Sequence, residues 1–590
     1  MAVKLHFSPR PNRAAEIKWQ QWGPDAFEQA QREAKPVLLA ISAVWCHWCH
    51  VMDETSYSDA GVIDLINQRF IPVRVDNDQR PDINARYNLG GWPTTAILTP
   101  EGEILRGGTY LPPEAMRPFL EQVSELYSDP ANRLEFAKRI AEMKAKRTAE
   151  RAAPEPGELD PETAHNLKDA LFEAFDDDYG GFGTEPKFPH IDALHFLLDR
   201  WSRTPDGRSQ TVVQMSLRAM AGRGMYDHIE GGFFRYSTTR DFSVPHFEKM
   251  LEDLGGLLLA CARAGALFGD AALSAVAADV KRYLDERLWS EQLRGYGGSQ
   301  DADEEYYQLD KDARAKMTAP FVDHTIYASW NAEAARALIV GGPLLAESGV
   351  DADTWVARGI AILDMLWEKL LVDGLMARFY DGAPHVRGLL VDQAWSAWAA
   401  VAAFSASGDA RWLARARALV GATDVLNDSR SVAYLDRLPT SEPGRVGEPN
   451  TPLQENALMS RVLLWLGALL GEPRYAERGR AILERFARSY KTAGIFAAGY
   501  AAAVLDALEP PLEIKIAGPR DAGSTRALRD SARSLGAPPL RINTIDPSER
   551  GRLASLDVTA SDEPVAYVCR MDSCFARATR PEELRRALVR

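Results

Sequence analysis

Cysteine is scarce in this chain, which contains only five cysteines among 590 residues. So few cysteines exclude a fold held together by a network of disulfides, the framework of many small secreted domains. Two of the five, Cys46 and Cys49, nevertheless lie close together in the stretch AVWCHWCHVM. In a chain otherwise poor in cysteine, such a pair is more often reactive or metal-binding than structural.

Long apolar segments and an excess of positive charge are also lacking. No stretch is long and apolar enough to span a membrane, and the start, MAVKLHFSPRPNRAAEIKW, has neither the apolar run nor the cleavage site of a secretory signal. The chain has 69 Lys and Arg against 83 Asp and Glu, a formal net charge of -14, which argues against nucleic acid as the main partner. We therefore expect a cytoplasmic protein with no nucleic-acid and no membrane partner.

Helical and strand patterns alternate over the first 125 residues. The pattern predicts a helix at 23–34, a strand at 35–45, helical structure at 46–70, a strand at 71–78, strands at 94–100 and 103–110, and a helix at 112–127. This order predicts an α/β sandwich, and with a CxxC pair after its first strand it resembles thioredoxin.

The cysteine pair lies where the first predicted strand meets the next helix. Unpaired backbone N–H groups and the helix dipole stabilise a thiolate at a helix N-terminus, so we expect Cys46 to be the nucleophile of a redox pair. Cys49, one turn later on the same face, is the expected resolving thiol. His47 between them favours the thiolate of the reduced form. The resemblance to thioredoxin assigns to Pro93, in GGWPT, the role of the cis-proline that faces the two sulfurs.

A zinc site and an inert structural pair are the alternatives for this stretch. Structural zinc needs four ligands, and only His47 and His50 lie near the two cysteines in the sequence. Cys569 and Cys574 are far away along the chain. The sequence therefore favours a pair that cycles between dithiol and disulfide, with no metal and no cofactor.

The chain is too long for one core, so several domains are expected. A charged helix followed by a Pro- and Glu-rich stretch ends the first of them. We place a thioredoxin-like domain at 1–148, a linker at 149–160, a helical domain at 161–508 and a small α/β region at 509–590. The predicted fold class is therefore multidomain, α/β plus all-α.

The helical domain shows twelve segments of helical period and almost no strand pattern. The segments begin near residues 161, 190, 208, 247, 270, 325, 353, 390, 409, 452, 472 and 493. Their connections alternate between short and long, which predicts six helical hairpins. Six hairpins closed in a ring form an (α/α)6 barrel with every long loop on one rim, where we expect a pocket.

The long loops contain distinctive strings. They are FDDDYGGFGTEPKFPH (175–190), GMYDHIEGGFFRYSTTRDFSVPHFEKMLED (224–253), GYGGSQDADEE (295–305), SWN (329–331) and LLVDQAW (389–395). Together with WCHWCHVM and GGWPTTAILTP they resemble the thioredoxin-domain proteins of the spermatogenesis-associated protein 20 type. The resemblance implies a thioredoxin-like domain followed by a barrel similar to six-hairpin glycosidases and N-acylglucosamine 2-epimerases. The chain departs from the family between DADEE and SWN and at GEPNTPLQENA (447–457), both expected on the rim.

The predicted rim gathers acidic, histidine and aromatic side chains. The candidates are Asp227, His228, His246, Glu248, Asp301, Asp303, Trp330, Asn331 and Asp392. Glycoside hydrolysis needs an acid and a base carboxyl, whereas 2-epimerisation commonly needs an acid–base pair, often of histidines, and either set can be drawn from these residues. A structural role is the alternative for each of them. For example, His246 is placed to cap a helix and Glu248 to stabilise its dipole.

The last 80 residues return to alternating patterns, with strands expected at 511–518, 540–545 and 564–569 and helices at 524–536 and 580–589. Cys569 and Cys574 lie in an expected loop, where a disulfide or a second redox relay are alternatives to the favoured pair of half-buried thiols. Cys261, in an apolar helix, is expected in the core.

Two functions are consistent with these patterns. The favoured one is a thiol-disulfide oxidoreductase that acts on a protein or small-molecule disulfide, with a barrel that binds a carbohydrate-like ligand or a partner. The alternative is a carbohydrate-active enzyme, an epimerase or glycoside hydrolase, whose thioredoxin-like domain senses redox state. A non-catalytic interaction protein is a third possibility.

Overall fold

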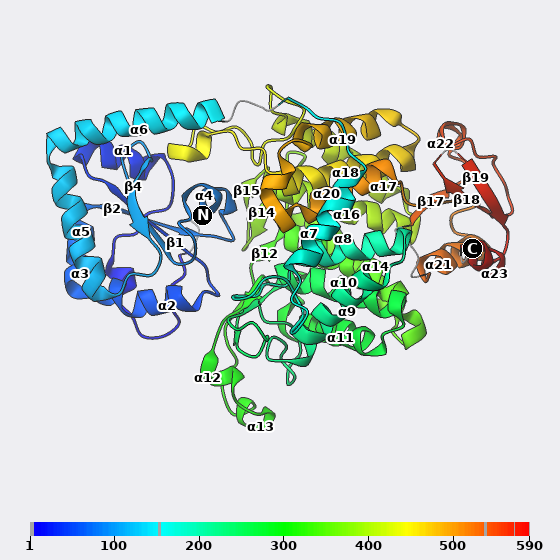
Figure 1. Cartoon of the computed structure of the whole chain (residues 1–590), viewed down its shortest axis with the longest axis horizontal. Helices are drawn as coiled ribbons and strands as arrows, with labels where there is room; N and C mark the ends of the chain where they lie inside the picture. The colour runs from blue at the N-terminus through cyan, green and yellow to red at the C-terminus, as the bar shows by residue number, and fades with distance from the viewer. Residues whose placement is uncertain (1–4, 151–154, 536–539, 572, 589–590) are drawn as a thin grey trace. The chain divides into compact units, whose positions relative to one another are not determined.

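The computed structural model describes residues 5–150, 155–535, 540–571 and 573–588 (Figure 1). These residues group into two compact units. The first contains Met1–Ala153, Asp301–Asp303 and Arg437–Asn450, and the second contains Pro154–Gln300, Glu304–Asp436 and Thr451–Arg590. The division into 1–148, 149–160, 161–508 and 509–590 stays a prediction.

The first unit is built on a four-stranded sheet of order β2-β1-β3-β4. Its strands are β1 (Val37–Ser42), β2 (Ile71–Asp76), β3 (Thr94–Leu98) and β4 (Ile104–Gly108). Its helices are α1 (Pro24–Glu33), α2 (His47–Glu54), α3 (Ala60–Arg69), α4 (Pro81–Tyr87), α5 (Pro113–Ser128) and α6 (Pro130–Glu150). Strand β1 pairs in parallel with β2 and antiparallel with β3, and both of its faces are buried. That double burial explains its continuous apolar run, VLLAIS. The predicted α/β sandwich is confirmed.

A segment from late in the sequence completes the core of this unit. Val446, 2% exposed, packs in the same apolar cluster as Trp22 and Tyr87. The Tyr87 hydroxyl donates to the Gly102 carbonyl at 2.7 Å and accepts from the backbone N–H of Arg445 at 2.7 Å. A Cβ on Gly102 would lie 2.3 Å from Cα of Gly444, so the two chain segments approach closely because both residues are glycine. Of the departure from the family pattern at 447–457, residues 447–450 therefore belong to this unit and residues 451–457 to the second.

The second unit contains a closed ring of helices. The inner helices are α8 (Ile191–Arg203), α10 (Leu251–Phe268), α14 (Ala328–Leu344), α16 (Leu390–Ser407), α18 (Leu453–Leu470) and α20 (Ala498–Leu508). Each packs against the next, and α20 packs against α8. The outer helices are α7 (Glu162–Ala174), α9 (Gly207–Gly222), α11 (Ala271–Tyr283), α15 (Ala352–Lys369), α17 (Ala410–Ala422) and α19 (Pro473–Phe486). The predicted (α/α)6 barrel is confirmed.

The two rings differ in sequence character, as their positions require. The inner helix α16 reads LVDQAWSAWAAVAAFSAS and is buried on nearly every side. The outer helix α19 reads PRYAERGRAILERF, with one apolar stripe and a charged face. A helix covered on all sides tolerates few charges, whereas a surface helix needs only one apolar stripe.

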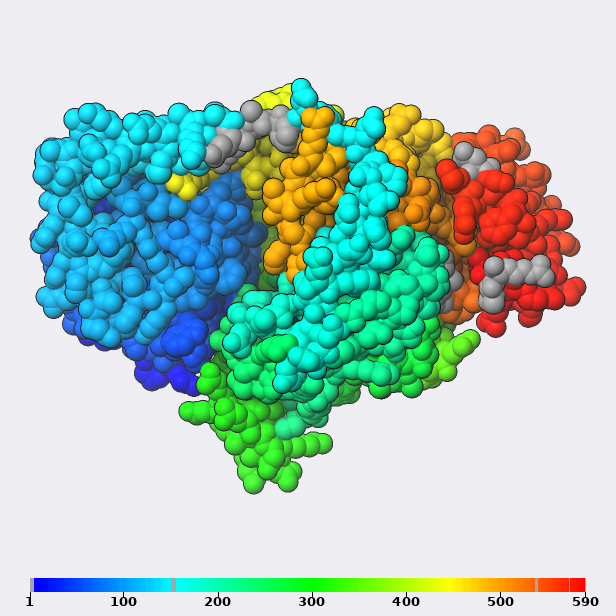
Figure 2. All heavy atoms as spheres, in the orientation of Figure 1, coloured from blue at the N-terminus to red at the C-terminus, as the bar shows by residue number. Residues whose placement is uncertain are grey.

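The long loops lead into the N-terminal ends of the inner helices and contain short strands that the sequence patterns missed. They are β5 (Tyr236–Ser237), β6 (Pro245–His246), β7 (Lys249–Met250), β8 (Trp289–Ser290), β9 (Gly295–Tyr296), β10 (Ser299–Gln300), β11 (Val322–Asp323), β12 (Ile326–Tyr327), β13 (Leu371–Val372), β14 (Leu375–Tyr380) and β15 (Pro384–Arg387). One loop also contains α12 (Glu304–Tyr307) and α13 (Lys311–Arg314), which project from the surface of the second unit (Figure 2).

A side-chain amide anchors three of these loops in the same way. Asn331, Gln393 and Asn456 each occupy the fourth position of an inner helix. The Asn456 Oδ1 accepts from the backbone N–H of Tyr434 at 2.8 Å, while its Nδ2 donates to the carbonyls of Tyr434 at 3.0 Å and Pro452 at 2.8 Å. The other two amides bond in the same pattern to the backbone of Tyr296 and Met376. Asn331, a candidate site residue, is therefore one member of a repeated structural anchor.

Removing this anchor should destabilise the barrel. In the Asn456→Ala variant the buried N–H and C=O of Tyr434 lose their partner, and we expect a loss of about 1–3 kcal/mol. The shift of the urea unfolding midpoint measures it. The Asn450→Ala variant, at an exposed position, is the matched control and should unfold as the wild type does. Equal midpoints for the two variants would contradict the anchoring role.

The C-terminal sheet repeats the strand order of the first unit. Its strands β16 (Glu513–Ala517), β17 (Arg541–Ile545), β18 (Val565–Arg570) and β19 (Ser573–Ala578) lie in the order β17-β16-β18-β19. Helices α21 (Gly523–Arg533), α22 (Arg550–Ser555) and α23 (Pro581–Leu588) occupy the corresponding connections. As in the first unit, the first strand is parallel to the second and antiparallel to the third. The strand-to-helix junction GPRDAG contains no cysteine, so the topology is repeated without the redox pair.

Cys569 and Cys574 lie opposite each other on β18 and β19 and form a disulfide. The expectation of a loop with two half-buried thiols is therefore wrong. The sequence pattern ended the sheet at Cys569, whereas the chain returns as β19, which pairs Cys574 with Cys569. Cys261 is fully buried in α10, as expected.

Candidate functional site

The Cys46–Cys49 pair lies at the N-terminus of α2, immediately after β1. Cys46 is the N-cap residue of α2, and its Sγ accepts a hydrogen bond from the backbone N–H of Cys49 at 3.2 Å. A disulfide joins the two residues. In the reduced form the same backbone N–H and the helix dipole would stabilise a thiolate on Cys46.

Two tryptophans connect the cysteine turn to the proline loop. The Trp45 ring packs edge-to-face on Trp92 with centroids 5.8 Å apart, and its Nε1 donates to Asp78 at 2.7 Å. The peptide bond between Trp92 and Pro93 is cis, as predicted. Trp48, between the two cysteines, is 46% exposed and is the large apolar side chain that this turn presents.

A buried ion pair lies beneath the turn. Asp53, on α2, and Arg74, on β2, are 0% and 5% exposed. They form two parallel hydrogen bonds of 2.7 and 2.9 Å. Because Arg74 neutralises this carboxylate, it adds little negative charge that would oppose a thiolate nearby.

His50 faces the same region on the following turn of α2. Burial lowers the pKa of His50, although Asp53 opposes the shift. Its Nδ1 lies 3.5 Å from Oδ2 of Asp301, which belongs to the same unit. His50 is therefore mostly neutral at pH 7, and a thiolate depends on the helix terminus rather than on this imidazole. In the described part of the chain no three His, Cys, Asp or Glu side chains are arranged as a metal site, so we assign no metal ligand.

The predicted rim residues are not brought together around one pocket. Asp301 and Asp303 group with the first unit. His228 is exposed, and its Nε2 lies 3.2 Å from the Arg223 carbonyl. His246 Nδ1 lies 2.9 Å from Glu248, and this carboxylate raises the pKa of His246 despite burial. As site residues they stay predictions.

Trp330 and Asp392, two further rim candidates, are both buried. Trp330, 4% exposed, packs on Tyr327 with ring centroids 4.5 Å apart. Asp392 accepts from the backbone N–H of Ser329 at 3.1 Å and from Arg378 at 3.2 Å. Burial raises the pKa of Asp392 to about 6.

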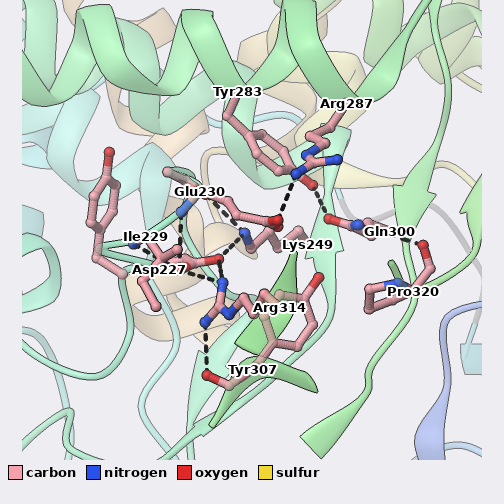
Figure 3. A network of polar contacts seen from close by, with 12 residues as sticks. Asp227, Ile229, Glu230, Lys249, Tyr283, Arg287, Gln300, Tyr307, Arg314 and Pro320 are labelled. Carbon is pink, nitrogen blue, oxygen red and sulfur yellow. Dashed lines mark hydrogen bonds and ion pairs between the residues drawn. The ribbon is translucent and has the colours of Figure 1, made fainter. Parts of the chain in front are cut away.

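Asp227 neutralises two buried cations (Figure 3). Its carboxylate accepts from Lys249 Nζ at 2.7 Å and from Arg314 Nη1 at 2.8 Å. Lys249 is fully buried, and its Nζ lies 4.4 Å from the centre of the Tyr283 ring. Burial lowers the pKa of Lys249 to about 8, while Asp227 opposes the shift. Through these contacts Asp227 links β7 to the loop that contains α13, so its contacts are those of a structural residue.

A cavity of about 660 Å³ lies inside the barrel. Its wall includes five carboxyl groups near the N-terminal ends of inner helices, and they are Asp192, Glu252, Asp253, Glu333 and Glu455. Trp395 and Trp398 of α16 also line it, as do Arg263, Arg336 and Arg461. Residues of α21 and β17 line its other end.

Burial holds protons on several of these carboxyl groups. It raises the pKa of Asp253 and of Glu455 to about 7, and the pKa of Glu333 well above its ordinary value. A Cβ on Gly256 would lie 3.0 Å from Glu333 Oε1, so the missing side chain makes room for this carboxyl.

His195, deeper in the cavity wall, is held neutral. Its Nε2 lies 3.1 Å from the Gly256 carbonyl, and Arg263 Nη1 lies 3.3 Å from its Nδ1. Burial, together with the charges of Arg263 and Arg336, lowers the pKa of His195 to about 3. This imidazole is therefore not placed to exchange protons near neutral pH.

Comparison with known proteins agrees with the architecture. A family described as Thioredox_DsbH, protein of unknown function, DUF255, matches residues 10–145. Human spermatogenesis-associated protein 20 is 36% identical over 313 residues, which are 49% of this chain and 39% of the human protein. The rat protein of the same name is 35% identical over 313 residues with the same coverage. Over about half of its length the chain is similar to spermatogenesis-associated protein 20. The predicted resemblance is confirmed.

The matched 313 residues make up 39% of the length of the human relative. The cysteine pair lies within residues 10–145, which the family model matches. Among solved structures, a sugar epimerase from a ruminal bacterium aligns with a TM-score of 0.44 at 14% identity, covering 55% of this chain and 87% of that chain. The barrel itself is established by the packing of its own helices. Within the described residues, every helix is too short or too polar to cross a bilayer.

The sequence analysis did not choose the cavity carboxyl groups as candidates, although Glu252 and Asp253 lie in the quoted stretch 224–253 and Glu455 lies in 447–457. A usable signal was present, because Glu333 and Arg336 interrupt a helix that is otherwise apolar, ASWNAEAARALIVGGPL. Charged residues are rarely placed inside a buried helix without a partner or a function. Glu455 and Arg461 interrupt α18 in the same way.

Proposed function

We propose that the protein is a thiol-disulfide oxidoreductase that acts through Cys46 and Cys49. The supporting observation is the position of Cys46 at the N-cap of α2, where its sulfur accepts a hydrogen bond from a helix N–H and is bonded to Cys49. A sulfur held in this way is stabilised as an anion and is a good nucleophile and leaving group.

The proposed reaction is a two-electron exchange. The Cys46 thiolate attacks one sulfur of a protein or small-molecule disulfide, forms a mixed disulfide and releases one thiolate of the substrate. The Cys49 thiolate then attacks Cys46 Sγ, closes the Cys46–Cys49 disulfide and releases the second thiolate. A dithiol reductant returns the pair to the reduced state and is itself oxidised. Trp48 and the Pro93 loop are the surfaces next to the sulfur where a substrate would bind.

Reduction of insulin disulfides by dithiothreitol tests the proposal. The wild-type protein should accelerate the reaction, and the Cys46→Ser variant should fall to the rate of dithiothreitol alone. The Cys574→Ser variant is the matched control, since it removes a sulfur from the other disulfide, and it should retain the wild-type rate. Equal rates for the wild type and Cys46→Ser would overturn the proposal.

Reactivity of the sulfur gives a second measurement. In the reduced protein, on a Cys49→Ser background, Cys46 should alkylate at pH 7 about tenfold faster than an ordinary cysteine. An ordinary alkylation rate would contradict the stabilised thiolate. The alternative, a carbohydrate-active enzyme with a redox-sensing domain, predicts no insulin reduction and remains a prediction, as does a carbohydrate-like ligand of the barrel.

A further inference from the structure

One end of the barrel cavity lies against the C-terminal region of the second unit. The lining there consists of Ser405 and Ala406 of α16, Ala532 and Arg533 of α21, and Ile542 of β17. We call this part of the lining the α21 end. None of these five residues is acidic, whereas the cavity carboxyl groups described above come from the N-terminal parts of inner helices. The α21 end therefore differs from the rest of the cavity in charge.

The hydroxyl group of Ser405 is available at this end. Ser405 lies in the last turn of α16, lines the cavity and is 9% exposed. A hydroxyl that is buried normally has a hydrogen-bond partner, because burial removes its hydration. The Ser405 Oγ has no such partner among the described residues. Ser405 therefore offers a donor and an acceptor to a molecule in the cavity.

Arg533 places a positive charge beside Ser405. Its Nη1 donates to the carbonyl of Ala406, the residue after Ser405, at 3.1 Å. Its Nη2 lies 2.8 Å from Asp530 and 3.9 Å from Asp353, whose side chains are 52% and 95% exposed, so both carboxylates are in contact with solvent. The Nε of Arg533 is buried and has no partner among the described residues. Arg533 therefore has an N–H group that the described part of the chain does not use.

A second arginine adds to the positive charge at the end of α16. Arg529, one turn before Arg533 on α21, is 6% exposed, and its Nε and Nη1 have no partner among the described residues. A Cβ on Gly408, which ends α16, would lie 2.7 Å from Nη1 of Arg529. Burial lowers the pKa of Arg529, Asp530 opposes the shift, and the charge of Arg533 adds to it. A buried guanidinium in this state is stabilised by a nearby anion.

The neighbouring part of the cavity wall is apolar. Leu344 of α14, Val401 of α16 and Leu540, which precedes β17, line the cavity together with Ile542. Side chains of this kind favour hydrocarbon over hydroxyl groups in a ligand. The whole cavity, at about 660 Å³, lies within the range of small-molecule sites.

We propose that the α21 end of the barrel cavity binds the carboxylate of a small molecule whose body is apolar. The Ser405 hydroxyl and the Arg533 Nε–H each offer one hydrogen bond, and a carboxylate has two oxygens to accept them. Arg529 favours the same anion through its charge. The body of the ligand lies against the apolar wall.

A series of probes with one hydrocarbon chain tests the charge of the ligand. Hexanoate, hexan-1-ol and hexylamine differ only at one end, which is a carboxylate, a hydroxyl or an ammonium. By titration calorimetry on the full chain we expect hexanoate to bind at least about tenfold more tightly than the other two. Hexanol or hexylamine binding as tightly as hexanoate, or no binding of hexanoate, would overturn the proposal.

Two further probes test the anion and the body of the ligand. Gluconate, a carboxylate on a chain of hydroxyl groups, should bind at least about tenfold more weakly than hexanoate, because the wall is apolar. Hexyl phosphate should not bind more tightly than hexanoate, since the site offers two hydrogen bonds rather than the larger number that a phosphate accepts. Tight binding of gluconate would refute the apolar body, and a preference for hexyl phosphate would refute the carboxylate.

The Ser405→Ala variant tests the position of the carboxylate. Its fold should be retained, because the Ser405 Oγ bonds to no described residue, and its affinity for hexanoate should fall about tenfold. The Ser396→Ala variant is the matched control. Ser396 lies on the same helix, is fully buried and also has an Oγ without a partner among the described residues, but it is not one of the residues that line the cavity. It should bind hexanoate as the wild type does, and equal affinities for the two variants would overturn the assignment.

The Arg533→Gln variant tests the charge at the same place. We expect its affinity for hexanoate to fall at least about tenfold, whereas hexan-1-ol should bind as it does to the wild type. The Arg526→Gln variant removes a charge from an exposed position on the same helix and should bind hexanoate normally. A folded Arg533→Gln protein that keeps the full preference for hexanoate would contradict the proposal, and if this variant does not fold, the result for Ser405→Ala decides.

Discussion

We expect the Cys49→Ser variant to accumulate a stable mixed disulfide between Cys46 and its substrate, whereas the wild-type protein accumulates none. The N-cap position of Cys46 is retained in this variant, so its attack on a substrate disulfide is preserved. The second step fails because no sulfur lies one turn along α2 to displace the substrate. Mass spectrometry without reduction measures the trapped product as an added substrate mass on the peptide that contains Cys46.

Two controls separate this result from nonspecific oxidation. The Cys46→Ser variant, which keeps Cys49, should trap little substrate, because Cys49 lacks the N-cap position that stabilises a thiolate on Cys46. The Cys574→Ser variant should trap no substrate on Cys46. If Cys49 rather than Cys46 forms the adduct, the assigned roles of nucleophile and resolving thiol are reversed.

The second large effect is a loss of stability in the Asp227→Ala variant. This change leaves the fully buried Lys249 and the 5% exposed Arg314 without their shared carboxylate. Removing one partner of a buried ion pair costs about 3–5 kcal/mol. Chemical denaturation, followed by a probe of the barrel, should show this loss as a lower unfolding midpoint.

The neighbouring residue provides the matched control for this network. His228 is exposed, so His228→Ala should change stability by no more than about 0.5 kcal/mol. The double variant Asp227→Ala and Lys249→Met also removes the buried ammonium that has lost its carboxylate, and it should recover part of the lost free energy of unfolding. An Asp227→Ala protein as stable as the wild type would contradict the structural role and restore Asp227 as a candidate site residue.

The repeating patterns of this chain were readable from sequence. The twelve predicted starts of helices fall close to the observed ones, from 161 against Glu162 to 472 against Pro473, because each helix has a regular apolar period. The largest difference is at the last helix, where the 3-10 segment Tyr490–Ala497, broken at Gly494, precedes Ala498. Short rim strands such as β7 and β10 have two residues each, too few for a periodic pattern.

The candidate site was predicted unevenly. Cys46, Cys49 and Pro93 were recognisable because a local motif places them beside one strand and one helix. The rim candidates were chosen by residue type within the predicted loops. Residue type does not show whether an aspartate such as Asp227 is paired with buried cations or is available to a ligand. Glu333 was overlooked because it lies in a helix rather than in a loop, and Glu455 was not singled out although it lies in the stretch 447–457 that was expected on the rim.

The helices, the strands of both sheets except β19 and the cysteine pair at a helix terminus could be predicted from the sequence, because each depends on residues that are close together along the chain. Which charged groups come into contact depends on how the helices and strands pack together. Asp192, Glu333 and Glu455 are widely separated along the chain and share a cavity because the helical ring closes. Residues 437–450 complete the core of the first unit for the same reason: burial and charge compensation depend on distance in space.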